Sequence, residues 1–181
     1  VLRYAQAKGI PTFIHESNSL AGKSNILLGK KAKKVFVGSE RMEKFFPKEK
    51  LMITGNPVRS SIVKNEIGRE EGLRFFQLNP SKKTVLVTGG SLGAKGINEA
   101  IDAHIDEFAN QDVQLIWQTG KPYLQRAKEI SSGKKNIWTN DFITQMEYAY
   151  AAADLVISRS GAMAIAERVR TSISTLGSSR T

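Results

Sequence analysis

The stretch from Thr84 to Ala94 constrains the fold more than any other part of the chain. It reads Thr-Val-Leu-Val-Thr-Gly-Gly-Ser-Leu-Gly-Ala, a short apolar run followed by a glycine-rich turn. Such an apolar run, rich in β-branched residues, is typical of a strand covered on both faces. Glycines allow a tight turn whose backbone a ligand can approach closely. We therefore predict a buried strand, a turn, and a helix that opens at Ser91 to Ala94.

The turn has the character of an anion site. The first amides of a helix have no partner within the helix, and the helix dipole places positive charge behind them. The spacing of Gly89, Gly90 and Gly93 is neither that of a Rossmann fingerprint nor that of a Walker loop. From these residues alone two interpretations stay open: a phosphate site, or an ordinary strand-to-helix turn whose glycines serve packing.

Apolar runs and helical periodicity alternate along the rest of the chain. Strands are expected at 11–14, 35–37, 51–53, 84–88, 113–117, 136–139 and 154–157. Helices are expected at 1–8, 24–34, 39–46, 66–78, 91–108, 123–130, 146–153 and from 162 onward. This alternation predicts the α/β class, with parallel sheets covered by helices on both faces.

The predicted organisation is two α/β units joined by a connector. The break at Asn79-Pro80-Ser81 and the change of character before it separate a first unit, 1–60, from a connector, 61–82, and a second unit, 83–167. The segment 168–181 is rich in Ser, Thr and Arg, where a doubly wound domain would continue into an apolar strand. We expect this tail to be disordered or foreign to the fold.

Charge is concentrated in the first unit. The chain has a net charge of +10, and residues 1–60 hold 12 Lys and Arg against 4 Asp and Glu. Lys30, Lys31, Lys33 and Lys34 form a block that is interpreted either as a solvated helix end or as a contact for anionic lipid or another polyanion. Nucleic acid is disfavoured because the block has no interleaved aromatic residues.

Several other functions are excluded or left without support by composition. The absence of cysteine rules out disulfides and thiolate chemistry and fits a reducing compartment. No apolar run approaches the roughly 20 residues of a membrane span. No cluster has zinc spacing and no Ser-His-Asp arrangement is visible, so we predict no metal and no cofactor.

Candidate site residues follow the predicted strands of the second unit. In an open parallel sheet such turns line one crevice at the carboxyl edge. The glycine turn with Ser91, the backbone at Ile143 and the carboxylate of Glu167 together suit a nucleotide, since a carboxylate can accept two hydrogen bonds from a ribose diol. A glutamate such as Glu167, taken on its own, is more often a solvated helix residue, and its position after a Ser-Gly turn is what favours a site.

The first unit adds fewer candidates. His15 and Glu16 are interpreted either as an acid–base pair or as structural residues. Arg59 is either a surface residue or a diphosphate ligand, because its planar fork matches phosphate oxygens.

Six motifs in one order carry a family resemblance. They are His-Glu-Ser-Asn at 15–18, Gly-Asn-Pro-Val-Arg at 55–59, Gly-Gly-Ser-Leu-Gly-Ala at 89–94, Trp-Gln-Thr-Gly-Lys at 117–121, Asp-Phe-Ile at 141–143, and Ala-Asp-Leu-Val-Ile-Ser-Arg-Ser-Gly-Ala at 153–162. Over residues 3–167 this series resembles the MurG family of bacterial transferases. Each motif is weak alone, and their common order makes the resemblance specific.

The resemblance implies a fold and an activity. Such enzymes have the GT-B arrangement, in which two Rossmann-like domains face a cleft. They move N-acetylglucosamine from UDP-N-acetylglucosamine to undecaprenyl-diphosphate-linked muramyl pentapeptide in peptidoglycan synthesis, by direct displacement with inversion. The implied setting is the cytoplasmic face of the bacterial inner membrane, with peripheral attachment to its anionic surface.

The resemblance also implies site residues. Asn18 and Arg59 resemble donor contacts from the first domain and hinge, Ser91 the diphosphate contact, and Ile143 the residue whose backbone reads the uracil. The segment under the donor corresponds to Ala162, Met163, Ala164, Ile165, Ala166 and Glu167, with Glu167 on the ribose. His15, Glu16, Gly89, Gly90 and Gly93 are possible supporting residues.

Some family features are not found in the chain. The glycine-rich loop with the expected general base would lie upstream of Val1, so no catalytic residue is assigned here. The pattern usually has Gln where this chain has Ser17, and the sequence no longer follows the family after Glu167. We therefore expect a fragment, truncated at both ends, that is inactive alone. The alternatives are a non-catalytic UDP-sugar-binding module or another GT-B glycolipid transferase.

Overall fold

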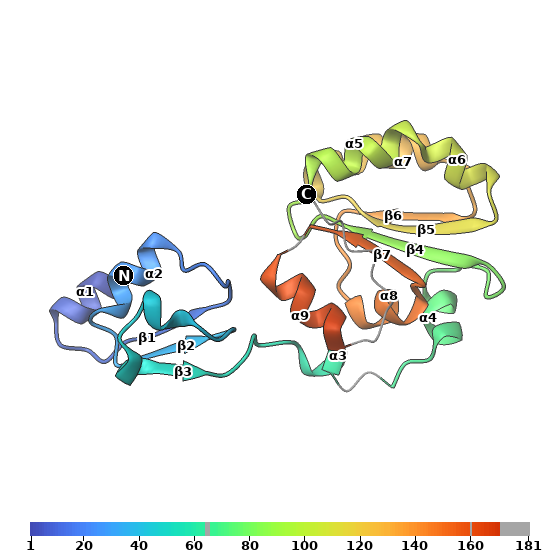
Figure 1. Cartoon of the computed structure of the whole chain (residues 1–181). Coiled ribbons are helices and arrows are strands. Elements are labelled where there is room, and N and C mark those ends of the chain that lie inside the picture. The colour runs from blue at the N-terminus through green and yellow to red at the C-terminus, as the bar shows by residue number, and fades with distance from the viewer. Residues whose placement is uncertain (64–65, 160, 171–181) are drawn as a thin grey trace. The chain divides into compact units, whose positions relative to one another are not determined.

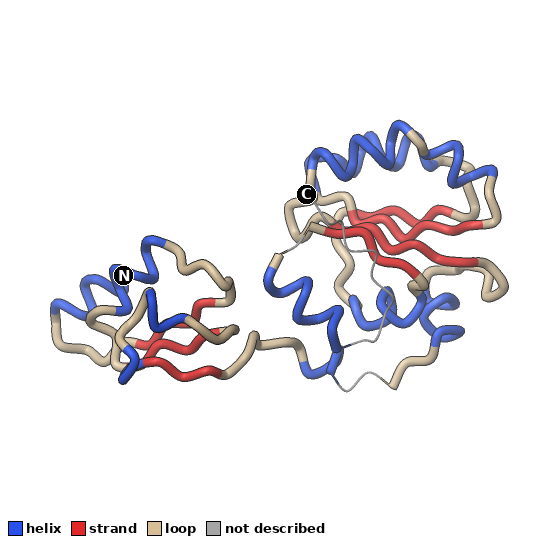
Figure 2. Tube along the Cα trace, in the orientation of Figure 1, coloured by secondary structure: helices blue, strands red, loops and turns tan. Residues whose placement is uncertain are grey.

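The computed structural model describes residues 1–63, 66–159 and 161–170, which divide into two compact units. The first spans Val1–Pro57 and the second begins at Val58. Each is built on a parallel sheet with helices, so the predicted α/β class is confirmed (Figures 1 and 2). From residue 171 on, the tail predicted over 168–181 lies outside the described residues.

The first unit is a three-stranded sheet in the order β1-β2-β3. Its elements are α1 (Leu2–Ala7), β1 (Phe13–Glu16), α2 (Lys23–Gly29), β2 (Lys34–Val37), β3 (Leu51–Ile53), and the 3-10 turns η1 (Met42–Lys44) and η2 (Lys48–Lys50). A small apolar core holds them together, made of Ile14, Ala21, Ala32, Val35, Val37, Met42 and Phe46. Most of these residues come from the apolar runs identified in the sequence.

The helix predicted over 24–34 is shorter in the structure. Helix α2 ends at Gly29, because the chain that follows joins the sheet. The Lys33 amide donates to the Thr12 carbonyl at 2.8 Å, and Lys34 pairs with Phe13. The basic block therefore runs from the end of α2, where Lys30 is the C-cap, into the start of a strand, and its interpretation as a solvated helix end holds for Lys30 and Lys31 only.

The helix predicted over 39–46 is also replaced. Only the single turn η1 forms there, and Arg41 before it adopts a left-handed conformation with φ of 62°. Met42 and Phe46 are still buried in the core of the first unit. A short apolar pattern cannot distinguish a helix from a compact turn that buries the same residues.

The second unit is a four-stranded parallel sheet in the order β6-β5-β4-β7. Its strands are β4 (Lys83–Thr88), β5 (Val113–Gln118), β6 (Ile137–Asn140) and β7 (Leu155–Ser158). Its helices are α3 (Ser60–Val63), α4 (Arg69–Phe75), α5 (Lys95–Ala103), α6 (Ile105–Asn110), α7 (Leu124–Ser131), α8 (Met146–Ala152) and α9 (Ala162–Arg170), with the 3-10 turn η3 (Lys121–Tyr123) before α7.

Both faces of this sheet are buried, as the continuous apolar strands predicted. Side chains alternate along a strand, so Val85 and Val87 contribute to one core and Leu86 to the other. The core that contains Val85 and Val87 packs against α5, α6 and α7, and the core that contains Leu86 packs against α4 and α8 on the other face of the sheet (Figure 1). The residues expected as a connector thus include α4, whose Leu73 is fully buried in the second unit.

The helix predicted after the glycine turn is two helices. His104 separates α5 from α6 with φ of −118° and ψ of 15°. Ile101 and Ile105 on either side are both buried, so the apolar spacing continues across the break. Among the described helices, none is both long enough and apolar enough to cross a bilayer.

Candidate functional site

The four strands of the second unit end at one level. Thr88 is in register with Gln118 and with Ser158, and Gln118 is in register with Asn140. Because the strands are parallel, the loops that follow them meet at the same edge of the sheet. The three turns singled out in the sequence are therefore brought together along this carboxyl edge.

The glycine turn joins β4 to α5. Gly90 and Gly93 have φ of 85° and 77°, in the left-handed region that favours glycine. A Cβ built on Gly93 would overlap the Thr119 carbonyl, so this turn packs backbone against the exit of β5. Helix α5 begins at Lys95, so the prediction that it opens at Ser91 to Ala94 is wrong by about a turn. The exposed Ser91 lies in the turn that precedes the helix.

The second loop follows β6 and carries Ile143. Ile143 is buried and its side chain packs in the core, so any contact that it makes with a ligand would come from its backbone. Its amide donates to Oε1 of Gln118 at 3.0 Å. Sequence reasoning missed Gln118; the available signal was a polar residue that ends an apolar strand.

The third element is the start of α9 with Glu167. This carboxylate is 9% exposed, and the Tyr150 hydroxyl donates to its Oε2 at 3.1 Å. Its Oε1 lies 4.0 Å from Nε of Arg59. Arg59 belongs to the second unit, and its Nη1 also donates to the Thr144 carbonyl at 3.5 Å. Arg59 and Glu167, far apart in sequence, are thus brought together beside the Ile143 loop.

The remaining residues predicted on α9 differ in exposure. Ala162, Met163 and Ala166 are half-buried, and Ile165 is 45% exposed. Ala164 lies in the same helix. Tyr150 was not predicted as a site residue, because in sequence it is one of two tyrosines in an alanine-rich helix and nothing distinguishes it from Tyr148.

In the first unit, His15 and Glu16 have separate partners. His15 Nε2 lies 3.1 Å from the Gly55 carbonyl, and its Nδ1 lies 3.2 Å from the Ser17 hydroxyl. Glu16 is buried and accepts four hydrogen bonds, of 2.9 to 3.0 Å, from the backbone and side chain of Asn18, the Gly22 amide and the Asn25 side chain. In the described part of the chain no bond joins His15 to Glu16, so these contacts do not favour an acid–base pair.

Glu16 holds Asn18 in place by this means. Its Oε1 receives both the backbone and the side-chain nitrogen of Asn18 at 3.0 Å. This fixes which way the Asn18 amide points and leaves its side-chain oxygen as the atom that can accept a bond from a ligand. The conformation of the loop after β1 therefore depends on one buried carboxylate.

We expect the first unit to lose stability in acid through Glu16. Burial alone raises the pKa of this carboxyl, but the donors from Gly22, Asn18 and Asn25 outweigh it, so the pKa lies below its ordinary value of 4.5. A group with a lowered pKa stabilises the fold above its ordinary value, and that contribution disappears as the pH falls through the folded pKa. Glu16→Gln should cost about 1–3 kcal/mol at neutral pH, because an amide nitrogen replaces an acceptor.

Urea unfolding followed by NMR signals of the first unit measures this effect, since both tryptophans lie in the second unit. The difference in unfolding free energy between wild type and Glu16→Gln should shrink as the pH falls below 4.5, because Glu16 takes up a proton more readily in the unfolded chain than in the folded one. The matched control is Glu40→Gln at an exposed carboxylate of the same unit. A difference that stays constant between pH 7 and pH 3 would contradict this role of Glu16.

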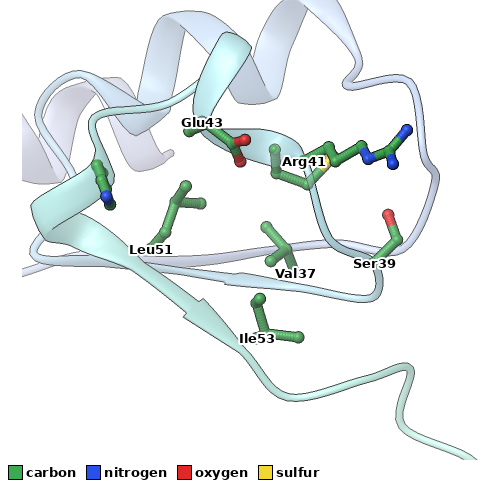
Figure 3. A pocket seen from close by; sticks show the side chains of 8 residues that line it. Val37, Ser39, Arg41, Glu43, Leu51 and Ile53 are labelled. Atoms are coloured by element: carbon green, nitrogen blue, oxygen red, sulfur yellow. The ribbon is translucent and has the colours of Figure 1, made fainter.

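The first unit also has a pocket of about 440 Å³. Figure 3 shows Val37, Leu51 and Ile53 on its apolar floor, with Ser39, Arg41 and Glu43 around them. Met42 and Lys48 complete the lining. None of the side chains predicted to bind the donor lines this pocket.

The fold and this edge define a parallel α/β protein whose loops can form a ligand site at the carboxyl ends of its strands. Residues 84–176 match the glycosyltransferase family 28 C-terminal domain, and the chain belongs to that family. The family match continues to residue 176, which is nine residues beyond Glu167, the last residue that the motif resemblance covers.

Two curated relatives and one solved structure agree with this assignment. The UDP-N-acetylglucosamine–N-acetylmuramyl-(pentapeptide) pyrophosphoryl-undecaprenol N-acetylglucosamine transferase of Parabacteroides distasonis is 52% identical over 165 residues, which cover 90% of this chain and 45% of the relative. The transferase of the same name from Flavobacterium psychrophilum is 48% identical over 167 residues, covering 92% and 45%. The crystal structure of Acinetobacter baumannii MurG matches with a TM-score of 0.59 and 26% identity, over 96% of this chain and 47% of that one. The predicted resemblance to the MurG family is confirmed, and the chain spans about half the length of the curated relatives it matches.

Proposed function

We propose that this chain carries the sugar-nucleotide site of an inverting N-acetylglucosaminyltransferase. The reaction would move N-acetylglucosamine from UDP-N-acetylglucosamine to undecaprenyl-diphosphate-linked muramyl pentapeptide, a step of peptidoglycan synthesis on which cell shape and division depend. The observation that carries the proposal is the convergence of the glycine turn, the Ile143 loop and Glu167 at one carboxyl edge. The names of the half-identical relatives supply the donor and the acceptor.

The glycine turn suits the diphosphate of the donor. At Gly90 an added Cβ would meet only the Arg159 side chain, at 3.6 Å, so the turn is open on that side, and the first amides of α5 follow directly after the turn. The exposed Ser91 hydroxyl can donate to a phosphate oxygen, and the half-exposed Arg59 supplies positive charge at the same edge. The proposal assigns the diphosphate to these groups.

Glu167 suits the ribose. A carboxylate has about four acceptor positions, and here Tyr150 uses one while Arg59 lies near another. Two hydroxyls of a ribose can therefore be accepted without breaking the bond from Tyr150. The loop backbone around Ile143, apart from the Ile143 amide that donates to Gln118, is assigned to the base, and Asn18 of the first unit to the donor sugar. No residue of this chain is assigned as general base.

A chimera tests the activity. The 165 matching residues of the Parabacteroides distasonis transferase would be replaced by those of this chain, and transfer of labelled N-acetylglucosamine to lipid acceptor would be measured. We expect an active chimera, because the donor machinery lies within the exchanged segment. A chimera that melts like the parent and binds UDP but transfers nothing would contradict the transferase and favour a binding module. Transfer of a different sugar would instead favour another glycolipid transferase.

The proposal includes attachment of the whole protein to the cytoplasmic face of the inner membrane. Lys30, Lys31 and Lys33 are exposed in the first unit, and the nearby Leu27 is 52% exposed. A basic cluster with exposed apolar side chains is attracted to anionic lipid, and salt screens that attraction.

Co-sedimentation with phosphatidylglycerol vesicles should therefore fall by about tenfold between roughly 0.05 M and 0.5 M salt. Changing Lys30, Lys31, Lys33 and Lys34 to Gln should abolish it. The control changes four exposed lysines of the second unit: Lys95, Lys121, Lys128 and Lys135. If both sets of lysine substitutions reduced vesicle binding equally, or if vesicle binding did not change with salt, attachment through the basic block would be contradicted.

A further inference from the structure

Gln118 bonds to two different loops at the carboxyl edge of the sheet. It is the last residue of β5 and is 2% exposed. Its Nε2 donates to the Gly90 carbonyl at 3.0 Å, and its Oε1 accepts from the Ile143 amide at 3.0 Å. One side-chain amide thus connects the glycine turn after β4 with the loop after β6.

These loops have no other direct link of this kind. Strand β5 lies between β4 and β6, so the two strands that carry the loops do not pair with each other. Among the described residues, no backbone hydrogen bond joins 89–94 to 141–145. The glycine turn also packs against Thr119 and Gly120, and the Gly120 amide donates to the Asp141 carbonyl at 3.0 Å. Gln118 adds to this backbone packing a side chain that bonds to both loops, and it thereby contributes to the distance between them.

The chemistry of the position requires an amide. Glutamine presents a donor to the Gly90 carbonyl and an acceptor to the Ile143 amide at the same time. Glutamate would oppose that carbonyl with a second acceptor, and an apolar side chain would leave a buried donor and acceptor unpaired. Neither can hold both loops as glutamine does.

We propose that Gln118 is a positioning residue that fixes the spacing between the diphosphate-binding turn and the base-binding loop. This rests on the proposed function, which assigns those two parts of the donor to those two loops. Gln118 is buried behind the loops and acts on the ligand through them. A ligand that spans both loops, such as UDP, depends on their spacing. Uridine or pyrophosphate alone, each bound by one loop, does not.

The test compares UDP, uridine and inorganic pyrophosphate on the full chain by calorimetry or NMR titration. Gln118→Met keeps the approximate volume and removes both hydrogen bonds. This variant should weaken the affinity for UDP by about tenfold or more, and the affinities for uridine and pyrophosphate by less than about threefold. Only UDP occupies both loops, so only its affinity depends on the distance between them.

The strand supplies a matched control. Gln114 is 1% exposed on β5, on the same face four residues earlier. It bonds to the backbone of Asn79 and to the Thr84 hydroxyl, at the opposite end of the strand. Gln114→Met should lower the melting temperature in the same way but leave the ratio of the three affinities unchanged.

Each outcome is decisive. If Gln118→Met binds UDP as wild type does, or weakens all three ligands equally, Gln118 is not a positioning residue. If Gln114→Met changes the affinity ratio as much as Gln118→Met, the effect is general destabilisation and the proposal is wrong. If wild-type chain binds none of the three ligands, the proposed function itself fails, which is a distinguishable result.

Discussion

Gly93→Ala is expected to unfold the carboxyl edge of the second unit and to abolish nucleotide binding. The φ of 77° at Gly93 is costly for any residue with a Cβ, and that Cβ would overlap the Thr119 carbonyl. Together these effects should lower the free energy of unfolding by roughly 3 kcal/mol. UDP affinity should fall by at least about tenfold, because the turn cannot keep its backbone where a diphosphate needs it.

A second glycine three residues later serves as the control. Gly96 lies in α5, and a Cβ built there meets nothing within 4 Å. Gly96→Ala should raise the free energy of unfolding by about 0.5 kcal/mol, since alanine favours a helix and restricts the unfolded chain. Urea unfolding followed by tryptophan fluorescence measures both variants. Equal stability of the two variants, with intact UDP binding, would show that the turn does not need its left-handed glycine.

Glu167→Gln is expected to weaken the affinity for UDP by about tenfold to a hundredfold, which is the effect of losing a hydrogen bond to a charged group. Glutamine keeps one acceptor, so the buried Tyr150 hydroxyl is still satisfied and the fold should change little. The loss should depend on the ribose. Wild type should bind UDP more tightly than 2′-deoxy-UDP, and Glu167→Gln should bind the two more nearly alike.

Two further variants separate the carboxylate from general effects of charge. Glu129→Gln, at an exposed position whose partner is Gln125 on the same helix, should leave UDP binding unchanged. Tyr150→Phe removes the hydroxyl that holds Oε2 of Glu167 and should weaken UDP by a smaller factor of about three to ten. Wild-type affinity in Glu167→Gln, with normal melting, would mean that Glu167 does not contact the ribose.

Strands and turns could be predicted from the sequence where neighbouring residues alone determine their structure. The apolar run at Val85 to Val87 and the glycines that follow identified β4 and its turn, because a strand buried on both faces has few alternatives. The alternation of such runs with helical periodicity gave two parallel sheets.

Breaks within a periodic pattern could not be predicted in this way. The stop at His104 leaves the spacing of Ile101 and Ile105 intact, so no signal marks it. The early end of α2 results from strand pairing at Lys33 and Lys34, a long-range contact that outweighs helix propensity.

The contacts that organise the site were also out of reach. Gln118 and Tyr150 act through partners more than 15 residues away, and the proximity of Arg59 to Glu167 spans over a hundred residues. Sequence patterns indicate which loops share an edge of a parallel sheet. They do not show which buried side chain connects those loops.

The sugar-nucleotide site can be tested by an NMR titration of the full chain with UDP. We expect saturable shifts of backbone amides in the glycine turn through Lys95, around Arg59, in the loop around Ile143, and at the start of α9 up to Glu167. Addition of inorganic pyrophosphate should reproduce only the shifts at the glycine turn and around Arg59. No saturation up to about 10 mM UDP, an affinity too weak for a specific site, or shifts confined to other regions, would contradict the sugar-nucleotide site.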